Sequence, residues 1–277
     1  MSRPATLAAV LVLPLVGCAP IPVPRASVFH PSDAAVGVTR VVHGTFVLQL
    51  RGTRLLVDPW FHSGILTRHR EPLGLTPATL PSLAAVLITS DTPEHFDAGA
   101  LRDLAPSIPR AIAPPGLRAR LLGLGFRDVT GLGWWQVTEV DGVTVTAVPT
   151  SAGARANGYV LTTGDVRCYV AGTTTAFPQL ADIAAALPEL DVAILPIGGV
   201  RVAGRLREMT PVQAADAAVT LRAARVVPSA YGARSRSPFT WHAGDALDAF
   251  RTAMAARGLG DRLVVIAPGE SWHYAKP

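Results

Sequence analysis

Lysine is almost absent from this chain of 277 residues: it occurs only at Lys276, so arginine supplies 24 of the 25 basic residues (25 − 1). The arginines form no dense run, and neither an RNA-binding aromatic motif nor zinc-finger spacing is present. The formal net charge of +5 therefore does not indicate a nucleic-acid partner. Charged residues make up only 16% and hydrophobic residues 49%, which excludes a disordered chain. Internal repeats and low-complexity blocks are also absent, which excludes a fibrous protein.

The apolar run at the start of the chain is too short to cross a bilayer, which needs about 20 residues. It extends from Ala5 to Gly17 behind a start that carries Arg3, the order typical of a secretory signal. The run ends in Leu-Val-Gly-Cys, which resembles the bacterial lipobox, where the cysteine becomes the lipidated first residue. We therefore predict a lipoprotein signal peptide over residues 1–17 and lipidation of Cys18. The alternative is an ordinary signal peptide with an incidental cysteine.

Cysteine is rare, because Cys168 is the only one besides Cys18. Acylation of Cys18 leaves no partner for an intrachain disulfide, and Cys168 lies in an apolar strand pattern that predicts a buried position. Residues 18–38 are rich in proline and predict an extended tether. Ala19, rather than aspartate, follows Cys18, which resembles the outer-membrane signal in organisms with two membranes. We expect a lipid-anchored protein on the periplasmic or extracellular face of the bacterial envelope, with the membrane as a partner and the oligomeric state open.

Residues 39–277 predict one domain, because no linker interrupts residues 39–270. Two Gly-Asp or Asp-Gly turns, at residues 141–142 and 164–165, lie between alternating runs and predict hairpins. A further hairpin is expected over residues 39–58. Buried strands are expected at 84–89, 110–113, 191–196, 225–228 and 263–267, and helices at 98–104, 116–124, 178–186, 211–224 and 243–257. Hairpins followed by strand–helix alternation, twice over, indicate two packed β-sheets with helices outside, an α/β fold.

Six segments together resemble the metallo-β-lactamase superfamily, in the branch that contains L-ascorbate-6-phosphate lactonase and N-acyl-phosphatidylethanolamine phospholipase D. These segments are 42–48 (VHGTFVL), 55–59 (LLVDP), 87–97 (LITSDTPEHFD), 169–174 (YVAGTT), 191–198 (DVAILPIG) and 209–215 (MTPVQAA). The resemblance implies a four-layer αββα sandwich with its site at one edge of the sheets. It also implies metal-dependent hydrolysis through two divalent ions.

The residues that this family uses as metal ligands are largely replaced here. The family supplies a His-x-His-x-Asp-His motif, a further histidine, a bridging aspartate and a last histidine. Of these seven positions only Glu94, for the aspartate, and His95 remain candidates. The other five carry neutral side chains: Ser90, Thr92, Ala152, Thr173 and Ala230. Because hydroxyl and methyl groups are poor zinc ligands, we predict loss of the metal centre with retention of the fold, and no cofactor.

Two alternatives keep some chemistry at this edge. Asp91, Glu94, His95 and Asp97 together resemble a set that holds a single zinc or other divalent ion. Against this, Asp97 precedes a helix as an N-cap residue does, and His43 and Asp58 are expected to be structural. A serine mechanism at Ser90 lacks the Gly-x-Ser-x-Gly elbow. No catalytic residue is therefore assigned from the sequence.

Arginines are expected around the same edge. In this fold the loops after three strands approach one another there, and they carry Arg155, Arg201, Arg205, Arg207, Arg234 and Arg236. Guanidinium groups around a metal-free cleft are suited to a phosphate, a carboxylate or a lipid head group. The alternative is scattered charge that keeps the protein soluble.

Three functions follow from these observations. The first is a membrane-anchored pseudoenzyme that binds a ligand, such as an anionic small molecule, or a partner without hydrolysis. The second is an active hydrolase of a phosphodiester, lactone or amide with an atypical mononuclear metal site. The third is an envelope scaffold.

Overall fold

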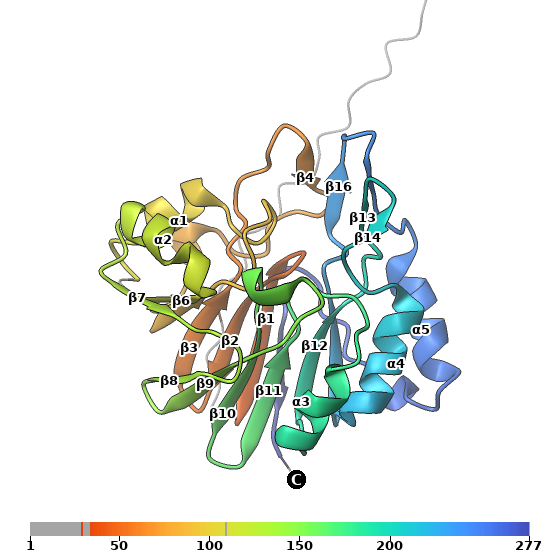
Figure 1. Ribbon diagram of the computed structural model, residues 1–277. Coiled ribbons are helices and arrows are strands. Elements are labelled where there is room, and N and C mark those ends of the chain that lie inside the picture. Colours follow the sequence, from red (N-terminus) through yellow and green to blue (C-terminus); the bar gives the residue numbers. More distant parts are fainter. Residues whose placement is uncertain (1–28, 30–33, 109, 277) are drawn as a thin grey trace, which may run out of the picture.

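The computed structural model describes residue 29, residues 34–108 and residues 110–276 (Figure 1). The predicted signal peptide and Cys18 lie outside the described residues. Strand β1 (Val36–Val42) begins inside the range that the sequence predicted as tether. In the described part of the chain, no helix combines the length and the apolar character needed to cross a bilayer.

Two β-sheets form the centre of the molecule. The first sheet has the order β18 (Ser271–Tyr274), β1, β2 (Thr45–Leu50), β3 (Thr53–Val57), β5 (Ala85–Leu87), β6 (Arg110–Ala113) and β7 (Asp128–Gly131). The second has the order β15 (Arg225–Ser229), β12 (Val192–Pro196), β11 (Val166–Val170), β10 (Gly158–Thr163), β9 (Val143–Val148) and β8 (Val137–Val140). In both sheets the hairpin strands pair antiparallel and the strands that alternate with helices pair parallel.

Three apolar clusters separate four layers. One cluster lies between the sheets and includes Phe46, Leu48 and Tyr159. A second joins the first sheet to α1 (Ala98–Leu104) and α2 (Arg118–Gly123). A third joins the second sheet to α3 (Leu180–Ala186), α4 (Pro211–Leu221) and α5 (Ala246–Ala255). Figure 1 shows these helices on the two outer sides. The predicted four-layer αββα sandwich is confirmed.

Most local predictions agree with these elements. Both predicted turns join hairpin strands, β8 to β9 and β10 to β11. Thr210 caps α4 through a reciprocal pair of hydrogen bonds with Gln213, although α4 ends at Leu221 rather than at residue 224. Cys168 is buried in β11 as expected.

The strand predicted at residues 263–267 is wrong. Leu263 forms only an isolated bridge with Val226, and the last strand is β18. The hairpin expected over residues 39–58 contains three strands rather than two, because the chain also turns at His43-Gly44, between β1 and β2. The apolar run at 263–267 indicated burial, which Ile266 has, but a pattern of five residues does not distinguish a buried loop from a strand.

Two small sheets project beyond the sandwich at the top of Figure 1. One pairs β4 (Thr67–His69) with β16 (Ala233–Ser235), and the other has the order β14 (Arg205–Leu206), β13 (Arg201–Val202) and β17 (Thr240–Trp241). We call residues 63–69, 200–207 and 233–241 together the tip. Its segments are joined by backbone hydrogen bonds, in which Arg236 donates to Leu66 and Ala203 donates to Phe239.

Candidate functional site

A cavity of about 570 Å³ lies between the sandwich edge and the tip. The loop after β5 contributes residues 90–94, and the loop after β9 contributes residues 151–152 and 155–156. Thr173, Thr175 and Glu208 complete its inner part, and tip residues form its mouth. The cavity therefore occupies the edge at which the sequence predicted the site.

Four neutral residues at expected ligand positions lie together in this cavity. The hydroxyl of Ser90 is 3.0 Å from that of Thr173 and 3.2 Å from that of Thr92, within hydrogen-bond reach of both. Ala152 lines the same cavity. The turn that holds Thr173 depends on Gly172, whose φ is +61° and which approaches Thr89 so closely that a Cβ would clash. These residues thus lie together at one edge of the sheets, as the family resemblance implied. Their hydroxyl and methyl groups do not fit a two-metal centre.

The last expected ligand position, Ala230, lies deeper. It is buried with a φ of +60°, and its backbone N–H donates to the carbonyl of His43 at 3.2 Å. A Cβ at Gly198 would meet both the Ala230 carbonyl and the Glu208 carboxylate, so Glu208 lies directly beside this position.

His95 is held by a buried carboxylate. Its Nδ1 lies 2.7 Å from Oδ2 of Asp58. The two oxygens of Asp58 also accept hydrogen bonds from the backbone N–H and the hydroxyl of Thr89, at 2.7 and 2.6 Å. This arrangement fixes the ring and directs Nε2 away from Asp58. A carboxylate behind one nitrogen of a histidine is the usual support of a metal-binding imidazole.

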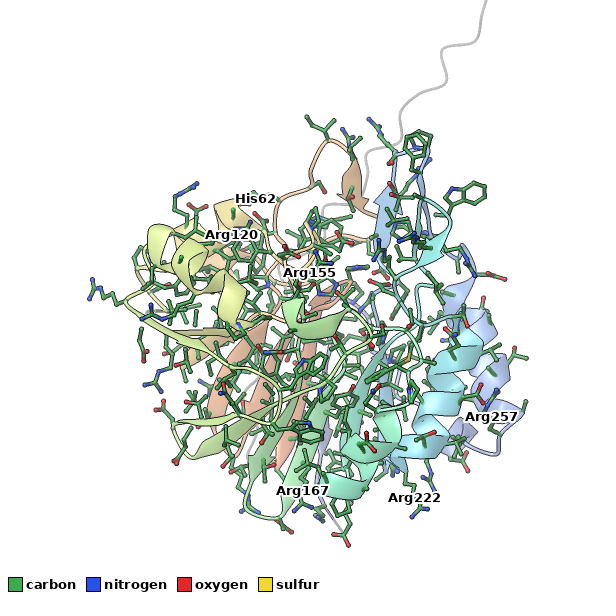
Figure 2. The ribbon with its side chains drawn as sticks, viewed as in Figure 1. His62, Arg120, Arg155, Arg167, Arg222 and Arg257 are labelled. Atoms are coloured by element: carbon green, nitrogen blue, oxygen red, sulfur yellow. The ribbon has the colours of Figure 1, made fainter. Side chains whose placement is uncertain are left out.

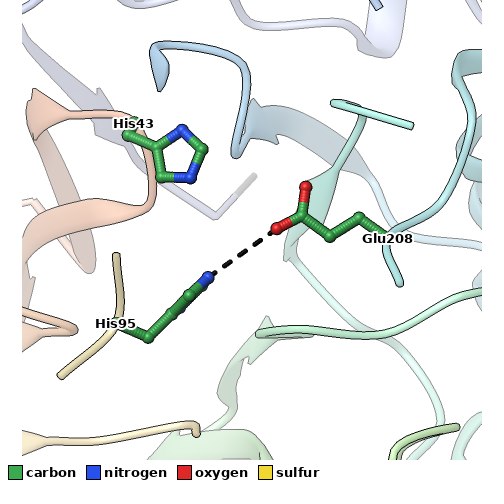
Figure 3. A group of neighbouring side chains, drawn as sticks. All are labelled: His43, His95 and Glu208. Atoms are coloured by element: carbon green, nitrogen blue, oxygen red, sulfur yellow. Dashed lines mark ion pairs between the residues drawn. The ribbon is translucent and has the colours of Figure 1, made fainter. Parts of the chain in front are cut away.

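His43 and Glu208 complete a buried cluster around His95 Nε2 (Figure 3). One ligand atom from each of the three side chains lies within 4.8 Å of the others, and Glu208 Oε1 is 3.8 Å from His95 Nε2. Both nitrogens of His43, His95 Nε2 and Glu208 Oε2 lack a hydrogen-bond partner among the described residues. Such atoms are rare in folded proteins, since each costs about 1–3 kcal/mol.

The charges of the three side chains differ. Burial alone would lower the pKa of His95, but Asp58, aided by Glu208, raises it to about 10. Burial lowers the pKa of His43 well below its ordinary value, and the neighbouring His95 lowers it further. Burial raises the pKa of Glu208, whereas His95 opposes that shift. These shifts favour a protonated His95 beside Asp58, and a neutral His43 that keeps a lone pair.

The other acidic candidates have different surroundings. Asp91 is exposed and Glu94 half-buried, and both line the cavity. Asp97 caps α1 by accepting from Ala100 N–H at 3.0 Å, and it also accepts from the backbone of His62 at 2.7 Å. His95 therefore lies with His43 and Glu208 rather than with Asp91, Glu94 and Asp97. Asp97 is the N-cap of α1, as the sequence analysis expected.

Only Arg155 and Arg207 of the six arginines line the cavity. Arg201, Arg205, Arg234 and Arg236 lie exposed on the tip. Figure 2 shows Arg155 near the upper ends of the strands, whereas Arg167 and Arg222 lie at the opposite end of the molecule.

Glu208 and the role of His43 were missed by the sequence analysis. Both residues lie outside the expected ligand motif. Glu208 stands three residues before the start of α4, and no spacing to other ligands marks it in the sequence. The available signal was that His43 lies within one family segment and that Glu208 directly precedes another, residues 209–215.

Comparison with known proteins agrees with this architecture. A sequence profile of the beta-lactamase superfamily domain matches residues 53–231. The chain belongs to the metallo-β-lactamase superfamily. A UPF0173 metal-dependent hydrolase of Pyrobaculum neutrophilum is 30% identical over 205 residues, which cover 68% of this chain and 81% of that protein.

An uncharacterized protein of Mycobacterium tuberculosis is 26% identical over 250 residues; the match covers 80% of this chain but only 66% of that protein. Among solved structures, the metallo hydrolase Igni18 of Ignicoccus hospitalis superposes with a TM-score of 0.70 at 22% identity, covering 87% of this chain and 99% of that one. Isothiocyanate hydrolase from Delia radicum gut bacteria gives 0.70 at 19% identity, with 86% and 99% covered. At these identities the likeness concerns the fold.

Proposed function

We propose that this protein is a lipid-anchored envelope pseudoenzyme that takes an amphiphilic molecule into its cavity from a membrane surface. It does so without hydrolysis through the family's two-metal chemistry. The observation that carries the proposal is that residues of one apolar, basic tip also form the mouth of the cavity: Leu66, Val202 and Arg207 belong to both.

The composition of the tip supports contact with anionic lipid. Five of the ten exposed large hydrophobic side chains in the described part of the chain lie on it: Ile65 (85% exposed), Trp241 (68%), Phe239 (67%), Leu66 (58%) and Val202 (37%). Its three stretches contain no aspartate or glutamate, and their exposed arginines are Arg68, Arg201, Arg205, Arg207, Arg234 and Arg236. Exposed apolar groups beside positive charge suit a membrane surface.

The lining of the cavity supports a head group with charges of both signs. Arg155 and Arg207 favour a phosphate or carboxylate, whereas Asp91 and Glu94 disfavour a second negative charge and favour an amine. An acyl or alkyl chain then leaves through the apolar mouth. Lipidation of Cys18 would hold the cavity near its source of ligand.

Vesicle binding tests the membrane contact. Residues 26–277, which lack Cys18, are expected to sediment with phosphatidylcholine vesicles only when these contain phosphatidylglycerol. The double substitution Ile65→Ser with Trp241→Ser should weaken this binding at least about tenfold, because burial of each apolar side chain contributes about 1.5–3 kcal/mol to the free energy of binding. Val212→Ser with Val219→Ser, two exposed positions on α4, is the matched control. Equal binding by both double variants would refute the role of the tip.

Calorimetry with dodecylphosphocholine tests the cavity, with dodecyl phosphate and dodecanol for comparison. We expect the zwitterionic amphiphile to bind most tightly. Arg207→Glu and Ala152→Trp should abolish this binding, whereas Arg222→Glu, at the opposite end of the molecule, should not. Absence of binding by every amphiphile would favour an envelope scaffold.

The buried His43–His95–Glu208 cluster favours a second candidate, a hydrolase with a single ion that acts on a phosphodiester, lactone or amide. It predicts turnover of one of these bond classes that is lost in Glu208→Gln. Turnover would replace the pseudoenzyme proposal.

A further inference from the structure

We infer that His43, His95 and Glu208 bind one divalent transition-metal ion, with Asp58 as the carboxylate that orients His95. Two of these three ligands stand outside the positions at which the family resemblance places metal ligands. The inference is independent of the membrane contact and of the amphiphile.

The unpaired atoms of the cluster carry the argument. Glu208 Oε1 lies 3.8 Å from His95 Nε2, which is beyond hydrogen-bond distance. Both nitrogens of His43, His95 Nε2 and Glu208 Oε2 are buried and have no hydrogen-bond partner among the described residues. A cation bound between the three side chains would satisfy one atom of each at once.

The chemistry of the donor set also fits. Two imidazoles with one carboxylate form the protein ligand set of several zinc sites, and the same set suits iron(II). Zinc bonds to such ligands are about 2.0–2.2 Å long. Ligand atoms that now lie up to 4.8 Å apart would therefore have to move together by about one ångström. Side-chain rotation supplies such a movement, because Glu208 has flexible torsions and borders the cavity.

The position of the cluster relates it to the replaced residues. Glu208 lies beside Ala230, where the last histidine of the family was expected, and a side chain at Gly198 would occupy the space between them. We read this as a mononuclear site rebuilt from other residues beside the former one.

Titration of the full chain with metal tests the site. The chain is purified in detergent without phosphate, treated with chelator, dialysed and titrated with Zn²⁺ and with Co²⁺. We expect one ion per chain, a rise in the thermal midpoint with Zn²⁺, and visible absorption bands of four- or five-coordinate cobalt. None of these readouts depends on enzymatic activity.

Variants then locate the ion. Glu208→Gln keeps the shape of the side chain, and His43→Asn retains a residue type that tolerates the positive φ of +50° at this position. Each should weaken Co²⁺ binding at least tenfold, and Glu208→Asp should restore part of it. His62→Asn, which removes an exposed histidine outside the cluster, is the matched control and should bind as the original chain does.

Two results would overturn the inference. One is the absence of stoichiometric Zn²⁺, Co²⁺, Mn²⁺ and Fe²⁺ binding by the unsubstituted chain, a measurement that does not depend on whether a variant folds. The other is binding that Glu208→Gln and His43→Asn leave unchanged in variants whose circular dichroism matches that of the original chain.

Discussion

Replacement of Asp58 by asparagine should destabilise the metal-free protein strongly. The Asp58 carboxylate is buried and accepts from Thr89 N–H, from the Thr89 hydroxyl and from His95 Nδ1, all at 2.6–2.7 Å. An asparagine amide has one acceptor oxygen, so its NH₂ group would face a donor. The substitution also leaves the charge of His95 without its nearest partner.

The expected magnitude follows from these contacts. Removing one partner of a buried ion pair costs about 3–5 kcal/mol, because the remaining charge stays desolvated. In a domain of this size each kcal/mol lowers the thermal midpoint by about 2–4 °C, which predicts a decrease of roughly 6–20 °C. Asp248→Asn provides the control, since Asp248 is 81% exposed and pairs with Arg251 on the surface of α5, where such a pair contributes about 0.5 kcal/mol or less.

Urea unfolding at neutral pH, with chelator present, measures the difference in free energy between Asp58→Asn and the original chain. A loss below about 1 kcal/mol, or one no larger than that of Asp248→Asn, would refute the reasoning. It would mean that His95 is not charged in the metal-free protein, or that Asp58 does not support it.

Two further predictions concern single residues. Thr210→Ala removes the hydroxyl that caps α4 and should reduce the free energy of unfolding by about 1 kcal/mol, measured by the same urea titration; Thr210→Ser, which keeps the hydroxyl, should not. Burial raises the pKa of the Cys168 thiol to about 12, so in a Cys18→Ser chain at pH 8 a disulfide reagent should label it only after unfolding; rapid labelling of the folded protein would contradict its position in the core.

The fold was predictable because its signals are local and agree with one another. Alternating runs on either side of an Asp-Gly turn specify β8 and β9, and Thr210-Pro211 specifies the start of α4. The prediction at residues 263–267 was wrong because only Leu263 of this run forms a bridge to β15, at the edge of the second sheet, whereas the last strand, β18, pairs with β1 in the first sheet. The local sequence does not show how many residues of an apolar run will pair with a neighbouring strand.

The candidate site was predictable only where it follows the family pattern. Ser90, Thr92 and Thr173 meet in one cavity because the strands before them end at the same edge of the sandwich. The partners of His95 did not follow from the pattern, since Glu208 lies 113 residues further along the chain (208 − 95) and has no motif of its own. Glu208 becomes a candidate ligand only because it is buried beside two imidazoles, an arrangement that arises only in the folded chain.

The neutral residues at the expected ligand positions and the presence of another donor set have a common physical cause. Replacing histidines and aspartates by hydroxyls removes charge from the inner cavity, where Ser90 and Thr173 now bond to each other. It leaves His95 and Asp58 in place, because Asp58 also fixes Thr89 and thereby the end of β5. A buried imidazole retained for that reason still needs a partner for Nε2, and Glu208 is the nearest group of opposite charge on that side. Retention of the fold thus keeps the imidazole of His95 in place, and the cobalt titration of Glu208→Gln tests whether the cluster around it binds an ion.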